Sequence, residues 1–122
     1  MANVVNWFEI PAKDLQRAKK FYSEVFDVEM SEHEMQGFKM AFFPMEENEI
    51  GGGLCEGEGY EPSKTGVKVY FNCGDDLSVQ LSRVEAAGGE IVMPKTLITE
   101  EIGYMAFIND TEGNGVAFHS KG

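Results

Sequence analysis

The sequence predicts an α+β fold made of two βαβββ modules, and three observations support this prediction. Short β-branched and aromatic segments alternate with two segments whose apolar residues recur at helical spacing. The order strand, helix, strand, strand, strand occurs twice within 122 residues. The two copies align at nearly constant offset, since residues 7–9 match 70–72 and residues 40–42 match 105–107. We therefore predict one domain over residues 1–122, with modules at about residues 1–57 and 66–122.

The first module begins with an apolar, aromatic strand that stops at Pro11. A helix over residues 14–26 follows, with its apolar residues on one face. Asp14 is placed to accept hydrogen bonds from the free amides of the first helical turn. The polar run at residues 45–49 separates the last two strands as a hairpin. The strands predicted for this module are residues 4–10, 28–33, 38–43 and 50–56.

The second module repeats this order after a turn-rich stretch at residues 57–66. Asp75-Asp76 opens its helix, and Gly88-Gly89 ends it, because glycine adopts the left-handed conformation of a helix cap. Residues 109–114 supply the last hairpin turn. One module alone would leave an apolar sheet face exposed, so we expect the two to share a core. The strands predicted here are residues 67–73, 90–93, 104–108 and 115–119.

Composition and charge exclude several classes of protein. The chain carries 10 Lys and Arg against 21 Asp and Glu, a net charge of −11, which repels nucleic acid and anionic lipid surfaces. No apolar run approaches the roughly 18 residues of a membrane span. No basic segment precedes an apolar one at the N-terminus, so we expect no signal peptide and a cytoplasmic protein. Cys55 and Cys73 form no CxxC motif, and we expect two buried, reduced thiols.

Three motifs make the chain resemble the vicinal oxygen chelate superfamily, which includes glyoxalase I, bleomycin-resistance proteins and extradiol dioxygenases. They are residues 8–22, which contain D-L-x-R-A-x-x-F-Y, residues 86–89 with the sequence A-A-G-G, and residues 109–114 with the sequence N-D-T-E-G-N. The resemblance covers essentially the whole chain and is strongest to a glyoxalase-related branch. It implies that the strands of both modules curl into a half-open barrel around a pocket, and that the protein is a homodimer.

The resemblance also implies where a metal would lie. In enzymes of this superfamily, a divalent metal is held by His, Gln or Glu on the first and last strands of each module, where it stabilises developing negative charge. Carried onto this sequence, the first-strand positions hold Trp7 and Tyr70, and the last-strand positions hold Leu54 and Ala117. Trp, Leu and Ala provide no ligand atom, and a neutral Tyr is a poor ligand. We therefore predict that the usual metal site is missing and that no cofactor is bound.

A register shifted by two residues gives a more ligand-like set, Glu9, Glu56, Asn72 and His119, on the same strand faces as the first set. We expect the first and last strands of a module to run antiparallel. The shift then separates the two members of each pair by roughly 13 Å, at a rise of ~3.3 Å per residue. On this expectation the four side chains do not converge on one metal.

Without a metal, the predicted pocket is lined by aromatic rather than ionic groups. Trp7 and Tyr70 form its floor, and Glu9 and Asn72 share their strand faces. Such a pocket fits a flat or apolar ligand that a few polar groups orient. The alternative is that these side chains fill the barrel and leave no cavity. The full set of predicted pocket residues is Trp7, Glu9, Met40, Phe42, Leu54, Tyr70, Asn72, Met105, Phe107 and Ala117.

Glu9 and His119 are the candidates for a catalytic role. Glu9 is a general base or ligand-orienting group, or a solvated residue at a strand edge, or the partner of a neighbouring base such as Lys68. His119 is either a surface residue or a catalytic one. Glu101 and Tyr104 belong to a turn that either contacts the ligand or is simply exposed.

Functions from different classes follow from these predictions. The first is a glyoxalase/bleomycin-resistance-like protein that binds a small molecule in the aromatic-lined pocket without the usual metal. The second is an enzyme of the superfamily, a lyase, isomerase or dioxygenase, with a displaced metal site. A third is a small structural or partner-binding domain whose barrel is filled. The residues at the metal positions favour the first, with a small molecule as the partner and neither nucleic acid nor a membrane.

Overall fold

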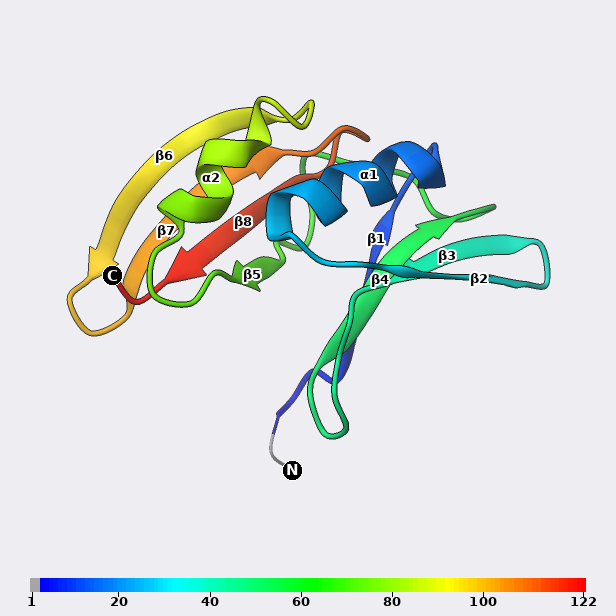
Figure 1. Cartoon of the computed structure of the whole chain (residues 1–122), viewed down its shortest axis with the longest axis horizontal. Helices are drawn as coiled ribbons and strands as arrows, with labels where there is room; N and C mark the ends of the chain where they lie inside the picture. Colours follow the sequence, from blue (N-terminus) through cyan, green and yellow to red (C-terminus); the bar gives the residue numbers. More distant parts are fainter. Residues whose placement is uncertain (1–2) are drawn as a thin grey trace.

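Two four-stranded sheets and two helices make up residues 3–122, the part of the chain that the computed structural model describes. Residues 1 and 2, the start of the first predicted module, lie outside this description. The strand order is β1-β4-β3-β2 in one sheet and β5-β8-β7-β6 in the other, so the same βαβββ topology occurs twice. The sheets lie side by side without closing, with β1 and β5 as the edge strands nearest each other (Figure 1). This arrangement confirms the predicted α+β fold.

The first module follows the predicted elements closely. Asp14 caps the first helix, because its side chain accepts a hydrogen bond from the Arg17 amide at 3.2 Å. Asp27 ends the helix in the left-handed conformation, with φ at 54°. The elements are β1 (Trp7–Pro11), α1 (Leu15–Phe26), β2 (Ser31–Met35), β3 (Phe38–Phe42) and β4 (Gly51–Glu56).

The second module differs from the prediction in three elements. Strand β6 continues past Pro94 to Thr99, the helix covers only residues 78–84 rather than the stretch from Asp75-Asp76 to Gly88-Gly89, and the first strand covers only residues 70–72. Register shifts between Met93 and Thr96 accommodate the proline, which cannot donate to the strand ladder. Gly88 takes the predicted left-handed conformation, with φ at 103°. Neither helix of the described residues has the length and apolarity needed to cross a membrane. The elements are β5 (Tyr70–Asn72), α2 (Ser78–Val84), β6 (Glu90–Thr99), β7 (Gly103–Asn109) and β8 (Gly115–Ser120).

The first and last strands of each module run parallel, so the expected antiparallel pairing is wrong. The reason lies in the connections. The three strands β2, β3 and β4 form an antiparallel meander, which makes β4 run in the direction of β2. A helical crossover brings β2 into the same direction as β1, and β1 therefore pairs with β4 in parallel. The second module repeats this geometry.

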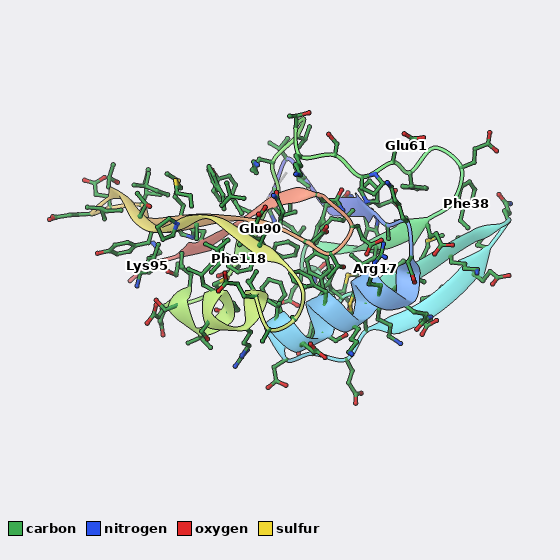
Figure 2. All side chains as sticks on the ribbon, turned by 90° about the horizontal axis from the view of Figure 1, so that it is seen from above. Arg17, Phe38, Glu61, Glu90, Lys95 and Phe118 are labelled. Carbon is green, nitrogen blue, oxygen red and sulfur yellow. The ribbon has the colours of Figure 1, made fainter. Side chains whose placement is uncertain are left out.

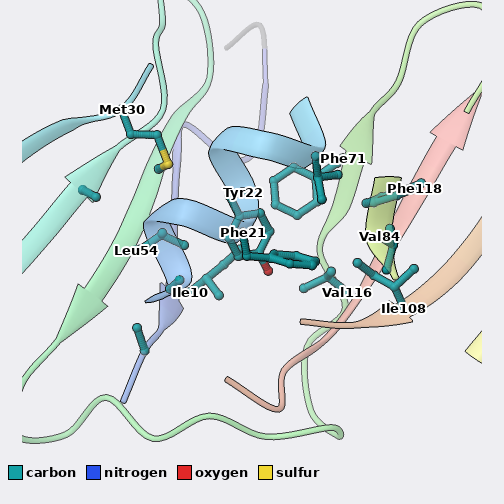
Figure 3. Close-up of a cluster of buried hydrophobic side chains, with 14 of the residues drawn as sticks. Ile10, Phe21, Tyr22, Met30, Leu54, Phe71, Val84, Ile108, Val116 and Phe118 are labelled. Atoms are coloured by element: carbon teal, nitrogen blue, oxygen red, sulfur yellow. The ribbon is translucent and has the colours of Figure 1, made fainter. Parts of the chain in front are cut away.

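Both helices pack on one face of the two sheets, and this face carries the shared core. Phe21 and Tyr22 of α1 lie between the sheets, next to Ile10 on one side and Val116 on the other (Figure 3). We call the opposite face of each sheet the open face. In Figure 2 the helices lie on one side of the sheets, whereas the segment that carries Glu61 lies on the other. The two modules thus share one core, as the sequence predicts.

The turn at residues 109–114 joins the second module to the start of α1. Both oxygens of the buried Asp110 carboxylate are occupied, one by the Tyr22 hydroxyl at 2.6 Å and the other by the amides of Glu112 and Asn114. Glu112 accepts from the amides of Lys13 and Asp14, and Arg17 binds both of its oxygens. This part of the N-D-T-E-G-N motif therefore holds the modules together.

Candidate functional site

A groove of about 980 Å³ runs between the edge strands β1 and β5. Three segments line it, residues 3–9, residues 48–50 and residues 67–72. The first and third segments are equivalent in the internal repeat, so the groove lies on the seam of the two modules. Its volume means that side chains do not fill the space between the edge strands.

The two edge strands present equivalent rows of side chains to the groove. The first row is Val5, Trp7 and Glu9, and the second is Lys68, Tyr70 and Asn72, 63 positions later. Alternate residues of an extended strand share a face, so each row lies on the open face. Trp7 is 37% exposed and Tyr70 is 48% exposed, which leaves both rings accessible to a ligand.

The Trp7 and Tyr70 rings each reach over a small residue on the adjacent strand and contact an aromatic ring on the strand beyond it. Trp7 lies opposite Gly51, and its ring meets the Phe42 ring edge-on at 5.2 Å between centroids. Tyr70 lies opposite Ala117, and its ring meets the Phe107 ring at 6.2 Å. A Cβ atom at Gly51 would come within 2.9 Å of the Trp7 ring. The aromatic pairs therefore require the small side chains between them.

The residues present do not fit the metal centre that the superfamily resemblance implies. The pairing places Gly51, rather than the predicted Leu54, at the last-strand position of the first module. Leu54 lies opposite Ile10 and is 0% exposed in the core, because an odd shift in register turns a side chain to the other face. Among Trp7, Gly51, Tyr70 and Ala117, only the Tyr70 phenol offers an oxygen. Residues 3–122 contain no group of three or more His, Cys, Asp or Glu that could hold a metal ion.

The set shifted by two residues needs a second correction. Because the strands are parallel, Asn72 and His119 are direct neighbours, and the predicted separation of the pairs is wrong. Glu56 instead lies on the helix face, where it accepts a hydrogen bond from the Leu15 amide at 2.7 Å. His119 is half-buried, and its Nε2 donates to the Ile102 carbonyl at 2.7 Å. The set therefore divides between two faces of the fold.

Glu9 is the anionic group at the centre of the first row. Its Oε1 accepts from the Tyr60 hydroxyl at 2.7 Å, and its Oε2 accepts from the Trp7 indole nitrogen at 3.3 Å. Of the alternatives for Glu9, the pair with Lys68 does not form: none of the ion pairs of residues 3–122 includes Glu9, and the Lys68 ammonium lies 5.0 Å over the Phe107 ring. The hydrogen bond to Glu9 raises the pKa of Tyr60 to about 12. Tyr60 therefore keeps its proton at neutral pH and remains a donor to Glu9.

The two cysteines are free and buried, as predicted. Burial and, to a smaller extent, the neighbouring Glu9 carboxylate together raise the pKa of the Cys55 thiol to about 11. Burial also raises the pKa of Cys73 to about 12. A thiol needs a lowered pKa to be a good nucleophile at neutral pH, so the chemistry of the groove does not centre on cysteine.

The remaining predicted residues fall into two groups. Phe42 and Phe107 stand behind the groove as partners of its two aromatic rings, and Met40 and Met105 lie on the same open faces. Tyr104 lies on the helix face, where it packs against the core, rather than in an exposed turn, and it does not line the groove. Glu101 is exposed in the turn between β6 and β7.

Of the predicted pocket residues, only Trp7, Glu9, Tyr70 and Asn72 line the groove, and sequence reasoning missed its other lining residues and the partner of Glu9. Lys68 was available from the repeat, since it lies two positions before Tyr70 on an alternating strand. Ile50 was assigned to a strand but lies at the groove in the loop before β4. Tyr60 lies in the turn-rich stretch, and its contact with Glu9 depends on the path of that loop, for which the sequence offers no signal.

Comparisons with known proteins agree with this architecture. Residues 4–118 match the Glyoxalase/Bleomycin resistance protein/Dioxygenase superfamily. A protein of Didymella fabae described as "Glyoxylase-like domain-containing protein" is 30% identical over 118 residues, which cover 90% of this chain and 88% of that protein.

Solved structures show the same fold. A glyoxalase/bleomycin resistance protein from Albidiferax ferrireducens has a TM-score of 0.76 and 14% identity, over 98% of this chain and 100% of that chain. Glyoxalase I from Zea mays has a TM-score of 0.74 and 19% identity, over 94% of this chain. The match covers only 43% of the maize chain, so this protein spans less than half of that enzyme's length. At these identities the likeness concerns the fold alone.

Proposed function

The chain belongs to the glyoxalase/bleomycin resistance protein/dioxygenase superfamily, and we propose that it binds a small organic molecule in the groove between β1 and β5 without the metal typical of the superfamily's enzymes. One observation carries this proposal. At the positions expected to hold metal ligands, the chain instead has Trp7 and Tyr70 beside Gly51 and Ala117, and these small residues allow aromatic pairs to form. The groove has aromatic walls in the place where metal-binding charge is expected.

The size and lining of the groove suit a small ligand. Small-molecule sites typically occupy about 300–1,000 Å³ and combine apolar walls with a few polar groups. This groove has a volume of about 980 Å³, with Glu9 and Asn72 beside its two exposed rings. Covering Trp7 and Tyr70 with a flat ligand removes apolar surface from water, which favours binding.

We also propose that the protein is a homodimer, as the superfamily resemblance implies. Large apolar side chains are exposed around the groove, among them Val5, Ile50 and Val67. A second copy that covers them would bury apolar surface and narrow the groove. Light scattering across a range of protein concentrations tests this point, and a monomer at every concentration contradicts it.

The binding proposal is tested by screening flat aromatic compounds in the presence of a metal chelator. Trp7 is the only tryptophan of the chain, so its fluorescence reports on the groove directly. We expect at least one compound to change this fluorescence and to raise the melting temperature with the chelator present. Tyr70→Ala should weaken that binding about tenfold, which corresponds to roughly 1.4 kcal/mol.

Leu97→Ala is the matched control. Leu97 is 49% exposed, which is similar to the exposed fraction of Tyr70, but it lies on β6 and does not line the groove. Its binding should equal that of the wild type. Loss of binding on chelation would favour the alternative, a metal-dependent lyase, isomerase or dioxygenase. An equal loss of binding in both variants would show that the ligand does not bind in the groove.

A further inference from the structure

The Glu9 carboxylate carries a negative charge that no cation neutralises within residues 3–122. The three ion pairs of these residues involve Glu112, Glu32 and Asp76. The two oxygens of Glu9 each accept one hydrogen bond, both from neutral donors, Tyr60 and Trp7. A carboxylate can accept about four hydrogen bonds, so Glu9 retains capacity for another donor. The two hydrogen bonds hold the Glu9 carboxylate in one orientation, and its negative charge remains accessible to a ligand in the groove.

Two aromatic side chains contact this carboxylate, Trp7 through its indole N–H and Tyr60 through its hydroxyl, and each packs against a phenylalanine. The Trp7 ring meets Phe42 edge-on, and the Tyr60 ring meets Phe38 in the same way at 5.8 Å. Gly53, which lies opposite Glu9 on β4, adds no side chain to this surface. The faces of aromatic rings attract cations, and tryptophan is the best of them. A carboxylate among such rings forms a site for a positively charged group with apolar substituents.

The second module shows the same chemistry within the chain itself. The Lys68 ammonium lies 5.0 Å over the Phe107 ring, next to the Tyr70 ring. In the internal repeat Phe107 corresponds to Phe42, and Lys68 corresponds to Val5. The first module has the equivalent aromatic pair, with the His33 ring stacked on Phe42 at 4.5 Å between centroids rather than a lysine over it. It also has Glu9 where the second module has the neutral Asn72.

The charge of the groove favours a cation in the first module. Its lining includes two carboxylates, Glu9 and Glu49, against one ammonium, that of Lys68. The Glu49 carboxylate already accepts a hydrogen bond from the Glu46 amide at 2.7 Å. The net charge of −11 also raises the concentration of cations near the protein surface.

We infer that the groove selects an organic ammonium ligand, whose positive nitrogen contacts Glu9 and the Trp7 and Tyr60 rings and whose apolar body lies toward Tyr70. This inference rests on the proposed function, since it names the chemical class of the molecule that the groove binds.

Three probes of nearly equal shape separate charge from size. They are phenyltrimethylammonium, its neutral isostere tert-butylbenzene and the anion benzenesulfonate. We titrate each at pH 8 and low salt and follow the fluorescence of Trp7. The ammonium probe should bind about tenfold more tightly than the neutral one, in the range expected for a desolvated cation on aromatic rings. The sulfonate should bind more weakly than either.

Two variants locate the source of this selectivity. Glu9→Gln keeps the size of the side chain and removes its charge, and the folded state should persist because Glu9 is exposed. In this variant the preference for the ammonium probe over the neutral probe should fall to about twofold. Glu49→Gln makes the same change of charge elsewhere in the groove and should retain most of the preference.

The outcomes distinguish the inference from the function on which it rests. Equal binding of the ammonium and neutral probes overturns the inference but leaves a functioning groove. An equal loss of preference in Glu9→Gln and Glu49→Gln also overturns it, because a diffuse field would then be the cause. If none of the three probes binds while other aromatic compounds do, the inference fails alone. If no compound of any class binds, both fail.

Discussion

The carboxylates of Glu112 and Glu9 lie in two contrasting regions of the molecule. Glu112 belongs to the turn at residues 109–114, which we call the seam turn because it joins the second module to α1, and Glu9 lines the groove. The Glu112 side chain is 0% exposed, and its oxygens accept from two amides, Arg17 and the Thr111 hydroxyl. The Glu9 side chain is exposed and accepts from two neutral donors. A saturated, buried carboxylate stabilises the fold, whereas an exposed, partly saturated one remains free to bind a ligand.

The comparison also separates the two kinds of motif in the sequence. The turn N-D-T-E-G-N contributes strongly to the superfamily resemblance, yet its Asp110 and Glu112 hold α1 rather than line the groove. Changes in the seam turn should therefore alter stability, and changes in the groove should alter binding.

Removing the buried Asp110 carboxylate should have the largest effect. Asp110→Ala leaves the Tyr22 hydroxyl and the amides of Glu112 and Asn114 without their acceptor. We expect a loss of about 3–5 kcal/mol in the free energy of unfolding, measured by urea denaturation. Tyr22→Phe removes one of these hydrogen bonds and should cost about 1–2 kcal/mol. A loss below about 1 kcal/mol in Asp110→Ala would contradict the role of the seam turn.

Neighbouring glycines of β4 provide a matched pair for the two faces. A Cβ atom at Gly52 would overlap the Phe8 ring on the helix face, so Gly52→Ala should lower the free energy of unfolding by about 1–3 kcal/mol. A Cβ atom at Gly51 would press on Met45 and the Trp7 ring. Met45 is exposed and has room to move, so Gly51→Ala should change stability by less than about 1 kcal/mol.

The Trp7 emission spectrum distinguishes these glycine variants. Gly51→Ala should shift the spectrum and weaken ligand binding, because the Trp7 ring must move away from β4. Gly52→Ala should leave the spectrum of the folded protein unchanged. The opposite pattern would mean that the open face and the helix face of β4 have been assigned the wrong way round.

Acid should reduce the contribution of the seam turn to stability, because the Glu112 carboxylate becomes protonated. Burial alone would raise the pKa of Glu112, but the hydrogen bonds from Arg17, the Asp14 amide and Thr111 outweigh it and lower the pKa below its ordinary value of 4.5. A carboxyl group with a lowered folded-state pKa stabilises the protein fully above its unfolded-state pKa. This contribution is lost as the pH falls through the folded-state pKa.

Glu112→Gln provides the measurement of this effect. The difference in free energy of unfolding between wild type and variant should be constant from pH 7 to about pH 5 and should shrink below about pH 4.5. Urea denaturation at several pH values gives the curve. If the difference in free energy of unfolding grew on acidification, the Glu112 carboxylate would not stabilise the fold through its charge.

Glu9→Gln should have the smallest effect on stability. The side chain is exposed, and glutamine retains an oxygen that accepts one of the two hydrogen bonds. We expect a change within about 0.5 kcal/mol in the free energy of unfolding. A much larger loss would show that the Glu9 carboxylate has a structural role similar to that of Glu112.

The helices, the repeat and the alternating rows could be predicted from the sequence because they depend on local periodicity. Asp14 caps α1 as its position predicts, and Trp7 and Tyr70 both line the groove. Errors arose where strand pairing decides the outcome. Leu54 was assigned to the open face, but it lies on the helix face. The register of β4 depends on its pairing with β1, which the sequence of β4 alone does not specify.

Two further features depended on chain paths that local sequence does not specify. The parallel direction of β1 and β4 follows from the helical crossover and the meander together. The contact between Tyr60 and Glu9 spans 51 positions and depends on how the turn-rich segment crosses the open face. Neither leaves a periodic pattern, so both required the folded structure.

A crystal structure of the protein with phenyltrimethylammonium, grown with added zinc and recorded with an anomalous signal at the zinc edge, shows whether the groove binds an organic cation or a metal. We expect ligand density between Trp7 and Tyr70, with the nitrogen against Glu9 and no anomalous peak in the groove. An anomalous peak bound by Glu9 or His119, with the probe displaced from the groove, would contradict this expectation.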